Sequence, residues 1–168
     1  MFFSTYLLAQ TSDLDELFET LQGDDRAAAM EAEQRIYEAW SDSGSPSMNL
    51  LLQRGRSAMQ AGNFEIAIEH LSALIDHAPD FAEGWNARAT AYFYMGEFML
   101  SVSDISQTLA RNPRHYGAMS GLGMILEQLG EHEQASAIFG EALELHPHSQ
   151  GLQRSVERLQ RKLYERTY

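Results

Sequence analysis

The sequence predicts an all-α solenoid of antiparallel helix pairs, and this prediction depends on three observations. Prolines recur at a spacing of 34 residues, at Pro79, Pro113 and Pro147. Glycines recur at the same spacing, at Gly62, Gly96 and Gly130. The alternating runs of Val, Ile and Thr that are typical of strands do not occur. A fixed period of this size indicates a repeat architecture, in which stacked helix pairs form a groove.

Residues 1–12 form an apolar segment without a charged side chain. The segment is too short to span a bilayer, which takes about 20 apolar residues. Two interpretations stay open: the remnant of an export signal that ends near Ala9, or an ordinary apolar segment that docks on the first helix. The first interpretation slightly favours a periplasmic or exported protein over a cytoplasmic one.

Residues 13–46 predict a degenerate helical pair followed by a short connector. The first helix, over residues 13–22, has an apolar face made of Leu14, Leu17, Phe18 and Leu21. The second helix, over residues 25–41, has an apolar face made of Ala29, Ala32, Ile36 and Trp40. The Ser, Gly and Pro residues that follow, up to Pro46, are typical of a connector. We expect this pair to pack on the first repeat unit.

Residues 48–149 divide into three units, 48–81, 82–115 and 116–149. Small residues at unit positions 8 and 20 let the two helices of a unit approach closely: Gly55, Ala89 and Gly123, then Ala67, Ser101 and Ala135. Bulky residues at positions 4, 11 and 24 fill the space between units, among them Trp85, Tyr92 and Phe139. Glycine at position 15 accepts the positive φ of a tight helix end. Proline at position 32 ends the second helix, because it cannot sit in a helix interior.

This pattern resembles the tetratricopeptide repeat (TPR). The second unit matches best, through Trp85, Tyr92, Gly96 and Pro113. The third unit adds Leu122, Gly123, Gly130, Ala135, Phe139, Ala142 and Pro147. The first unit has Gly55, Gly62, Ala67 and Pro79, but it departs from the TPR pattern at Arg54 and Ala58. The resemblance implies a TPR solenoid over residues 48–149. The whole chain also resembles the small exported TPR proteins of bacteria.

Residues 150–168 predict a capping helix. Leu152, Val156, Leu159 and Leu163 form an apolar stripe with charged residues on the opposite face. A solenoid needs such a helix to cover the apolar face of its last unit.

The protein is acidic, with a formal net charge of −12. This charge argues against nucleic acid and against an anionic membrane surface as partners, because both need clustered Lys and Arg. The charge is uneven: residues 12–42 are strongly acidic, whereas the tail from residue 149 is basic. Either these are two solvated helix faces, or the ends make a head-to-tail contact between copies or bind two different partners. A homo-oligomer therefore stays open.

No motif for catalysis, metal binding or a cofactor stands out. The chain has no cysteine, which excludes thiol nucleophiles and Cys-ligated metals. None of the six histidines lies in an HExxH pattern, and His146 and His148 flank Pro147 at a unit boundary, where histidines are ordinary. Nucleotide-binding glycine motifs are absent. We therefore expect no enzymatic activity, no metal and no cofactor.

The resemblance implies a concave groove lined by the first helix of each unit. The residues at the groove positions are Asn49, Leu52, Arg56, Met59, Gln60, Glu83, Asn86, Thr90, Phe93, Tyr94, Ser120, Met124, Glu127 and Gln128. Apolar members such as Met59 and Tyr94 could bury an apolar anchor of a peptide, and polar members such as Arg56 and Asn86 could bond to its backbone or to an acidic group. Alternatively, Phe93 and Met124 pack inside the array.

TPR domains that bind the carboxylate tails of chaperones use a clamp of Lys, Asn, Asn, Lys and Arg. The matching positions here are Leu52, Arg56, Ala87, Gly117 and Gly121, so only Arg56 is cationic. The sequence therefore predicts a non-catalytic scaffold or adaptor that binds a partner protein or peptide in its groove, but not such a tail. The alternative is an accessory subunit or assembly factor of a larger envelope or membrane complex, bound through its convex face or its ends.

Overall fold

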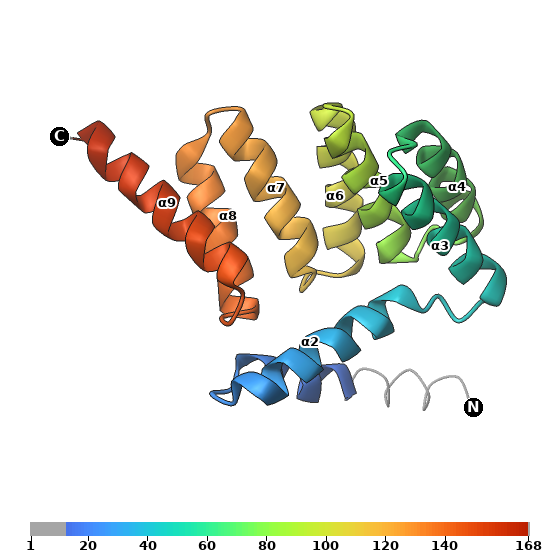
Figure 1. Ribbon diagram of the computed structural model, residues 1–168, viewed down its shortest axis with the longest axis horizontal. Coiled ribbons are helices and arrows are strands. Elements are labelled where there is room, and N and C mark those ends of the chain that lie inside the picture. Colours follow the sequence, from blue (N-terminus) through green and yellow to red (C-terminus); the bar gives the residue numbers. More distant parts are fainter. Residues whose placement is uncertain (1–12, 168) are drawn as a thin grey trace.

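The computed structural model describes residues 13–167, and the apolar segment at residues 1–12 lies outside this range (Figure 1). A helix over residues 13–22 is followed by α2 (Arg26–Ser41), α3 (Pro46–Gln60), α4 (Phe64–His77), α5 (Ala82–Tyr94), α6 (Phe98–Arg111), α7 (Tyr116–Gln128), α8 (His132–Leu145) and α9 (Gln150–Thr167). No strand occurs in the described part of the chain. This confirms the predicted all-α solenoid.

Helices α3 to α8 form three antiparallel pairs, α3 with α4, α5 with α6, and α7 with α8. The glycine that ends the first helix of each pair has a positive φ: 75° at Gly62, 78° at Gly96 and 82° at Gly130. Helix α3 begins at Pro46, which the sequence analysis placed in the connector. Proline fits the first turn because its missing N–H would have no partner within the helix there.

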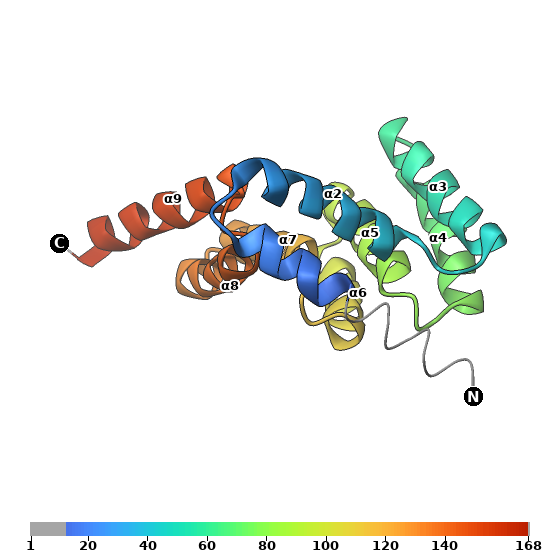
Figure 2. The same cartoon turned by 90° about the horizontal axis from the view of Figure 1, so that it is seen from below.

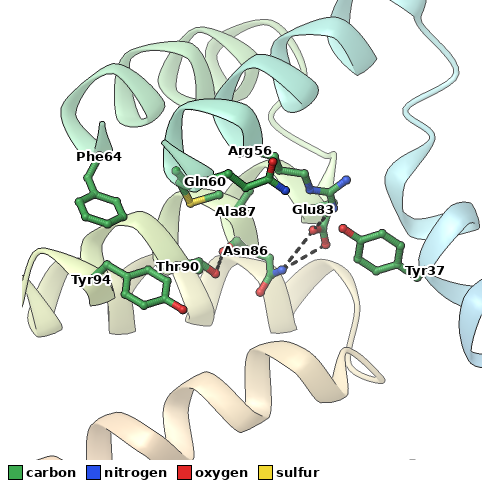
Figure 3. A pocket seen from close by; sticks show the side chains of 10 residues that line it. Tyr37, Arg56, Gln60, Phe64, Glu83, Asn86, Ala87, Thr90 and Tyr94 are labelled. Carbon is green, nitrogen blue, oxygen red and sulfur yellow. Dashed lines mark hydrogen bonds and ion pairs between the residues drawn. The ribbon is translucent and has the colours of Figure 1, made fainter. Parts of the chain in front are cut away.

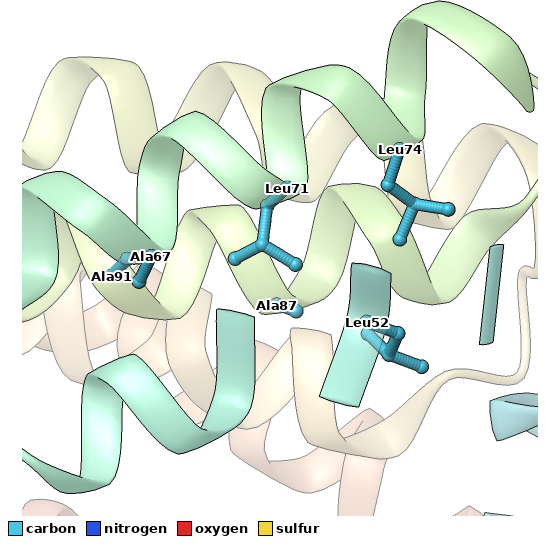
Figure 4. Packing of buried hydrophobic residues seen from close by; sticks show 6 residues of the cluster. All are labelled: Leu52, Ala67, Leu71, Leu74, Ala87 and Ala91. Carbon is cyan, nitrogen blue, oxygen red and sulfur yellow. The ribbon is translucent and has the colours of Figure 1, made fainter. Parts of the chain in front are cut away.

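Small residues bring the two helices of a pair together, as the spacing predicted. A Cβ added to Gly55 would lie 2.6 Å from Leu71 Cγ, and one added to Gly123 would lie 2.8 Å from the Phe139 ring. Around the first of these contacts, Leu52, Leu71 and Leu74 form a buried cluster with three alanines from α4 and α5 (Figure 4). The close approach of the helices therefore depends on glycine at both positions.

Trp85 does not fill the core between units, although its repeat position predicted this. Its indole N–H donates to the Pro79 carbonyl (2.8 Å), and the Arg111 guanidinium lies 4.9 Å from its ring centroid. The Arg111 Nε–H donates to the same carbonyl (2.5 Å). Trp85 therefore fastens the turn between the first two units, and its ring stays partly exposed.

Helix α9 covers the end of the array. Leu152 and Leu159 are buried in one cluster with Ala135, Phe139 and Ala142 of α8. Exposed polar side chains, among them Gln153 and Glu157, occupy positions that contact a second helix in the preceding units. The stack therefore ends on a polar surface, as the solubility of a solenoid requires.

The helix over residues 13–22 and α2 form an N-terminal hairpin, residues 13–41, which crosses the ends of the other helices (Figure 2). Its core of Leu17, Phe18, Leu21, Ala32 and Ile36 also contacts Trp40, Tyr116 and Leu145. Tyr116 begins α7 and Leu145 ends α8, so this core packs on the third unit. The first unit contacts the hairpin through Arg56, which lies over the Tyr37 ring and donates to the Ser41 hydroxyl. The expectation that the pair packs on the first unit is therefore wrong for its apolar core.

Aromatic and polar contacts determine where the hairpin docks. The Trp40 and His115 rings are stacked, with centroids 4.3 Å apart and 20° between their planes. Arg114 lies over the Phe18 ring and pairs with Asp15 at 2.8 Å. Farther along, His148 Nε2–H donates to the carbonyl of Gly23 (2.6 Å). The hairpin is thus attached at the turns that contain Pro113 and Pro147.

Candidate protein-binding groove

The first pocket of the concave face lies between α3 and α5, with α2 along one side (Figure 3). Its volume is about 450 Å³. It is lined by Tyr37, Arg56, Met59, Gln60, Phe64, Glu83, Asn86, Ala87, Thr90 and Tyr94. Tyr94 is 64% exposed and stacks on Phe64, with ring centroids 5.6 Å apart. This end of the pocket is therefore an open aromatic surface.

A second, smaller pocket of about 150 Å³ lies between α5 and α7. Phe93 and Met124 line it from opposite sides, and Gly117 and Gly121 leave two positions of its α7 wall without a side chain. Asn86, Thr90 and Tyr94 line both pockets, so the two are continuous. We call them together the concave groove. The smaller pocket has room for one apolar side chain.

The structure brings together these predicted groove residues: Arg56, Met59, Gln60, Glu83, Asn86, Thr90, Phe93, Tyr94 and Met124. Phe93 also packs on Phe98, whereas Met124 is exposed. The alternative that both pack inside the array therefore holds only in part, for Phe93.

The other predicted groove residues lie elsewhere. Leu52 is a core residue, only 2% exposed, because its helix face turns toward α4 and α5. Asn49 bonds to Asp42 and Ser43 of the connector. Glu127 pairs with Arg158 of α9 at 2.6 Å. Ser120 and Gln128 are on α7, outside both pockets.

Glu83 is the centre of a buried polar network at the floor of the groove. It is 4% exposed, and its two oxygens accept from Arg56 Nη2 (2.6 Å) and His115 Nε2 (2.9 Å). The Asn86 amide also donates to both oxygens (Figure 3). Burial raises the pKa of Glu83, but the contacts with His115 and Arg56 outweigh it and lower the pKa below its usual value. Glu83 is therefore a carboxylate at neutral pH.

His115 has a fixed tautomer in this network. Its Nδ1 accepts from the backbone N–H of Ala118 (3.0 Å), as an N-cap of α7. The proton is therefore on Nε2, which donates to Glu83. The Arg56 cation and the Glu83 anion form an ion pair at the floor of the groove. The charged groups at the floor of the groove are therefore already paired with each other.

Two aromatic residues that line the groove, Tyr37 and Phe64, were not among the predicted groove residues. Phe64 begins α4 and recurs as Phe98 and His132 in the next units, so its repeat position was visible but its orientation was not. Tyr37 belongs to the hairpin, where no repeat marks it. Only the position of the hairpin explains its place in the groove.

The tetratricopeptide repeat family model matches residues 52–93 and 86–149. The chain belongs to the TPR family. A TPR repeat-containing protein of Rhizobium etli is 37% identical over 153 residues, which cover 89% of this chain and 74% of that protein. The resemblance to the tetratricopeptide repeat is thereby confirmed.

Solved TPR domains share the fold of this TPR array. The Sgt2 TPR domain from Aspergillus fumigatus has a TM-score of 0.68 and 22% identity, over 73% of this chain and 83% of that one. The first TPR of Spaghetti (RPAP3), bound to the HSP90 peptide SRMEEVD, has a TM-score of 0.68 and 24% identity, over 71% and 95%. At sequence identities this low, the similarity shows that the fold is shared.

The clamp positions of this TPR array offer no free cation. Ala87 is buried with Leu52, and Gly117 and Gly121 have no side chain. Arg56 is bonded to Glu83 and to the Ser41 hydroxyl (3.1 Å). A carboxylate in the groove would therefore have to compete with the buried Glu83.

Residues 13–165 contain no group of three or more His, Asp or Glu side chains that could hold a metal ion. Of the helices that the structure describes, none is long and apolar enough to cross a membrane.

Proposed function

We propose that this TPR protein is a non-catalytic scaffold that binds an extended segment of a partner protein in its concave groove. The supporting observation is the open aromatic surface of Tyr94 and Phe64 beside a pocket with room for a side chain. Exposed aromatic side chains next to a concavity are typical of protein-binding surfaces. The peptide bound by the TPR domain of Spaghetti (RPAP3) supports the same use of the fold.

The lining suits a segment that contributes apolar side chains and its backbone. Met59 and Met124 are flexible and can adapt to different apolar anchors. Gln60 is exposed and has no partner among the described residues, so its amide can bond to a peptide backbone. Arg56 and Glu83 neutralise each other, so the groove does not require a charged ligand at its floor.

The test is affinity capture of partners from native cell extracts, compared between the wild type and Tyr94→Ala. Tyr94 is suitable because its ring is exposed and its loss leaves the buried network intact. Arg56 is unsuitable, since its replacement would leave Glu83 buried without its cation. Tyr164→Ala on α9 is the matched control, because Tyr164 is equally exposed and lies outside the groove. A partner lost only with Tyr94→Ala supports groove binding, and one retained in both variants contradicts it.

A second candidate function is that of an accessory subunit or assembly factor in a larger complex. The observation in its favour is the exposed apolar side chains of Met95, Met99, Leu100 and Leu129, which lie outside the groove. Such residues are typical of surfaces that another protein covers. A complex of fixed stoichiometry that survives Tyr94→Ala but is lost with Met99→Asp would favour this function over groove binding.

A further inference from the structure

A third pocket lies between α2 and the first turns of α5 and α7, next to the concave groove. Its volume is about 370 Å³. It is lined by Met30, Glu33, Gln34, Tyr37, Trp40, Glu83, Asn86, His115, Tyr116 and Gly117. We call it the hairpin pocket, because α2 of the hairpin forms one whole wall. Tyr37, Glu83 and Asn86 line the first groove pocket as well, so a ligand in the groove can reach it.

The lining of the hairpin pocket has aromatic rings and carboxylates but no Lys or Arg. Tyr37, Trp40 and Tyr116 provide the rings. Of the two carboxylates, Glu83 is bonded on both oxygens, as described above. Glu33 is different: its side chain is 47% exposed, and its contact is with His146 Nε2 at 3.6 Å. Glu33 is therefore the carboxylate that a ligand can use.

The Glu33 carboxylate also affects the neighbouring ring. Burial, and after it the charge of Glu33, raise the pKa of the Tyr116 hydroxyl. This hydroxyl therefore stays protonated, and it adds no negative charge to the pocket. The negative charge that faces the open part of the hairpin pocket comes from Glu33.

Tyr37 already binds a cation within the protein. The Arg56 guanidinium lies 4.9 Å from its ring centroid. Arg56 lines the first groove pocket and not the hairpin pocket, whereas Tyr37 lines both. The ring is about half exposed, so it also presents surface to the hairpin pocket. Aromatic rings attract Arg and Lys side chains through the negative charge of their faces.

We propose that the hairpin pocket binds a cationic side chain, Arg or Lys, of the partner segment that lies in the groove. Glu33 pairs with the cation, and the Tyr37 ring covers it. The net charge of −12 acts in the same direction, because it attracts basic partners over a longer range. This inference rests on the proposed function for the partner, but the binding of a cation in the hairpin pocket can be measured without that partner.

The experiment uses two small probes of the same shape, N-acetylarginine methylamide and N-acetylcitrulline methylamide. Citrulline keeps the planar end group of arginine and lacks its charge. Each is titrated into the full-length protein and followed by two-dimensional amide NMR. We expect the arginine probe to shift the amides of Gln34, Tyr37 and Gly117 to saturation, and the citrulline probe to shift them weakly. Equal shifts with both probes would contradict a cation site.

Matched variants distinguish binding in the hairpin pocket from attraction by the overall negative charge of the protein. Glu33→Gln removes one charge inside the pocket and should weaken the arginine probe about threefold to fivefold, as for a partly exposed ion pair. Glu31→Gln removes one charge from the same helix outside the pocket and should leave binding unchanged. Tyr37→Leu should weaken the probe about threefold, and Tyr37→Phe, which keeps the ring, should restore it. Equal loss with Glu33→Gln and Glu31→Gln would overturn the proposal.

These measurements distinguish a failure of the groove proposal from a failure of the cation-site proposal. Tyr94→Ala lies outside the hairpin pocket and should leave the arginine probe unaffected while it abolishes capture of the partner. If Tyr94→Ala retains the partner but the arginine probe still binds at Glu33, the groove proposal fails and the cation site stands. If the arginine probe shows no saturable binding, the cation-site proposal is wrong, whatever the capture experiment shows.

Discussion

The array has two edges, and they differ in what covers them. The edge with the turns between units, at Pro79, Pro113 and Pro147, is held by side chains from elsewhere in the chain. Trp85 and Arg111 fasten the first of these turns, and the hairpin covers the other two. The edge with the turns inside units, at Gly62, Gly96 and Gly130, has no such cover among the described residues. We call them the covered edge and the bare edge.

This difference shows how a repeat protein acquires individual properties. Because the sequence repeats, every unit contributes one turn to each edge of the array and one helix to each face. Residues outside the period then decide which edge is closed, through contacts such as Trp40 with His115. The bare edge keeps exposed apolar side chains, with Met99 76% exposed. Stability should therefore be concentrated on the covered edge, and binding capacity on the groove with its adjoining hairpin pocket and on the bare edge.

The largest expected effect is at Glu83, beneath the covered edge. Glu83→Ala leaves Arg56 and His115 without their carboxylate, and breaking a buried pair in this way costs about 3–5 kcal/mol. Urea denaturation followed by circular dichroism measures this loss. Glu97→Ala at the bare edge is the control, because Glu97 is exposed and makes no side-chain cap, and it should change stability by less than about 0.5 kcal/mol. Similar losses at both positions would remove the contrast between the edges.

The next largest effect is at Trp40, which attaches the hairpin. Trp40→Ala should cost about 3 kcal/mol, the lower end for an aromatic core residue, because Trp40 is only partly buried. The loss should be local, since the three helix pairs have clusters of their own. Hydrogen exchange should show faster exchange over residues 13–41 and unchanged protection in α4, α6 and α8.

Trp85→Ala is the counterpart at the same edge. Trp85 fastens one turn within the array rather than a separate element, so its loss should not release the hairpin. If Trp40→Ala speeds hydrogen exchange throughout the array, the hairpin and the array unfold as one cooperative unit. The hairpin is then not a separate element of the covered edge.

Much of the fold could be predicted from the sequence, because the features concerned are local or periodic. The turns at Gly62, Gly96 and Gly130 follow from the spacing of glycine, and the close helix contact at Gly123 from the spacing of small residues. The groove helices follow from the same period. These features need only the residues of one unit and its neighbour.

The docking of the hairpin could not be predicted in this way. Trp40 contacts His115, which lies 75 residues later in the chain, and no period relates the two positions. For the same reason, the place of Tyr37 in the groove was not visible. Arg56 was visible as a groove residue, but its partner Glu83 was assigned to the same surface as a separate ligand-binding residue. Pairing between groove positions depends on side-chain directions that spacing alone does not give.

A pH-dependent effect should also belong to the covered edge, through His146. Burial lowers the pKa of His146 below its usual value of 6.5, although the charge of Glu33 opposes this. The folded protein therefore binds a proton less readily than the unfolded chain, so His146 supports stability above pH 6.5 and this support is lost as the pH falls below it. Each unit of pKa difference corresponds to about 1.4 kcal/mol.

This effect is measured as the slope of unfolding free energy against pH between about pH 7.5 and 5.5, near the usual pKa of histidine. His146→Gln cannot titrate there, and its slope should be smaller than that of the wild type. His77→Gln is the control, because His77 is exposed at the end of α4, away from the hairpin. An equal reduction of the slope in both variants would show that the pH dependence is not a property of the covered edge.

The smallest effect on stability is expected at Met99, on the bare edge. Met99→Ser should change the unfolding free energy by less than about 0.5 kcal/mol, because the side chain is 76% exposed and leaves little apolar surface to lose. The value is measured under the same denaturation conditions as Glu83→Ala. A loss above about 1 kcal/mol, which is typical of a residue with packing partners, would mean that Met99 is covered in solution, for example by a second copy. In that case the loss should depend on protein concentration, since dimer formation stabilises the folded state by mass action. A concentration-independent loss would instead indicate packing within one chain, and the bare edge would not be bare.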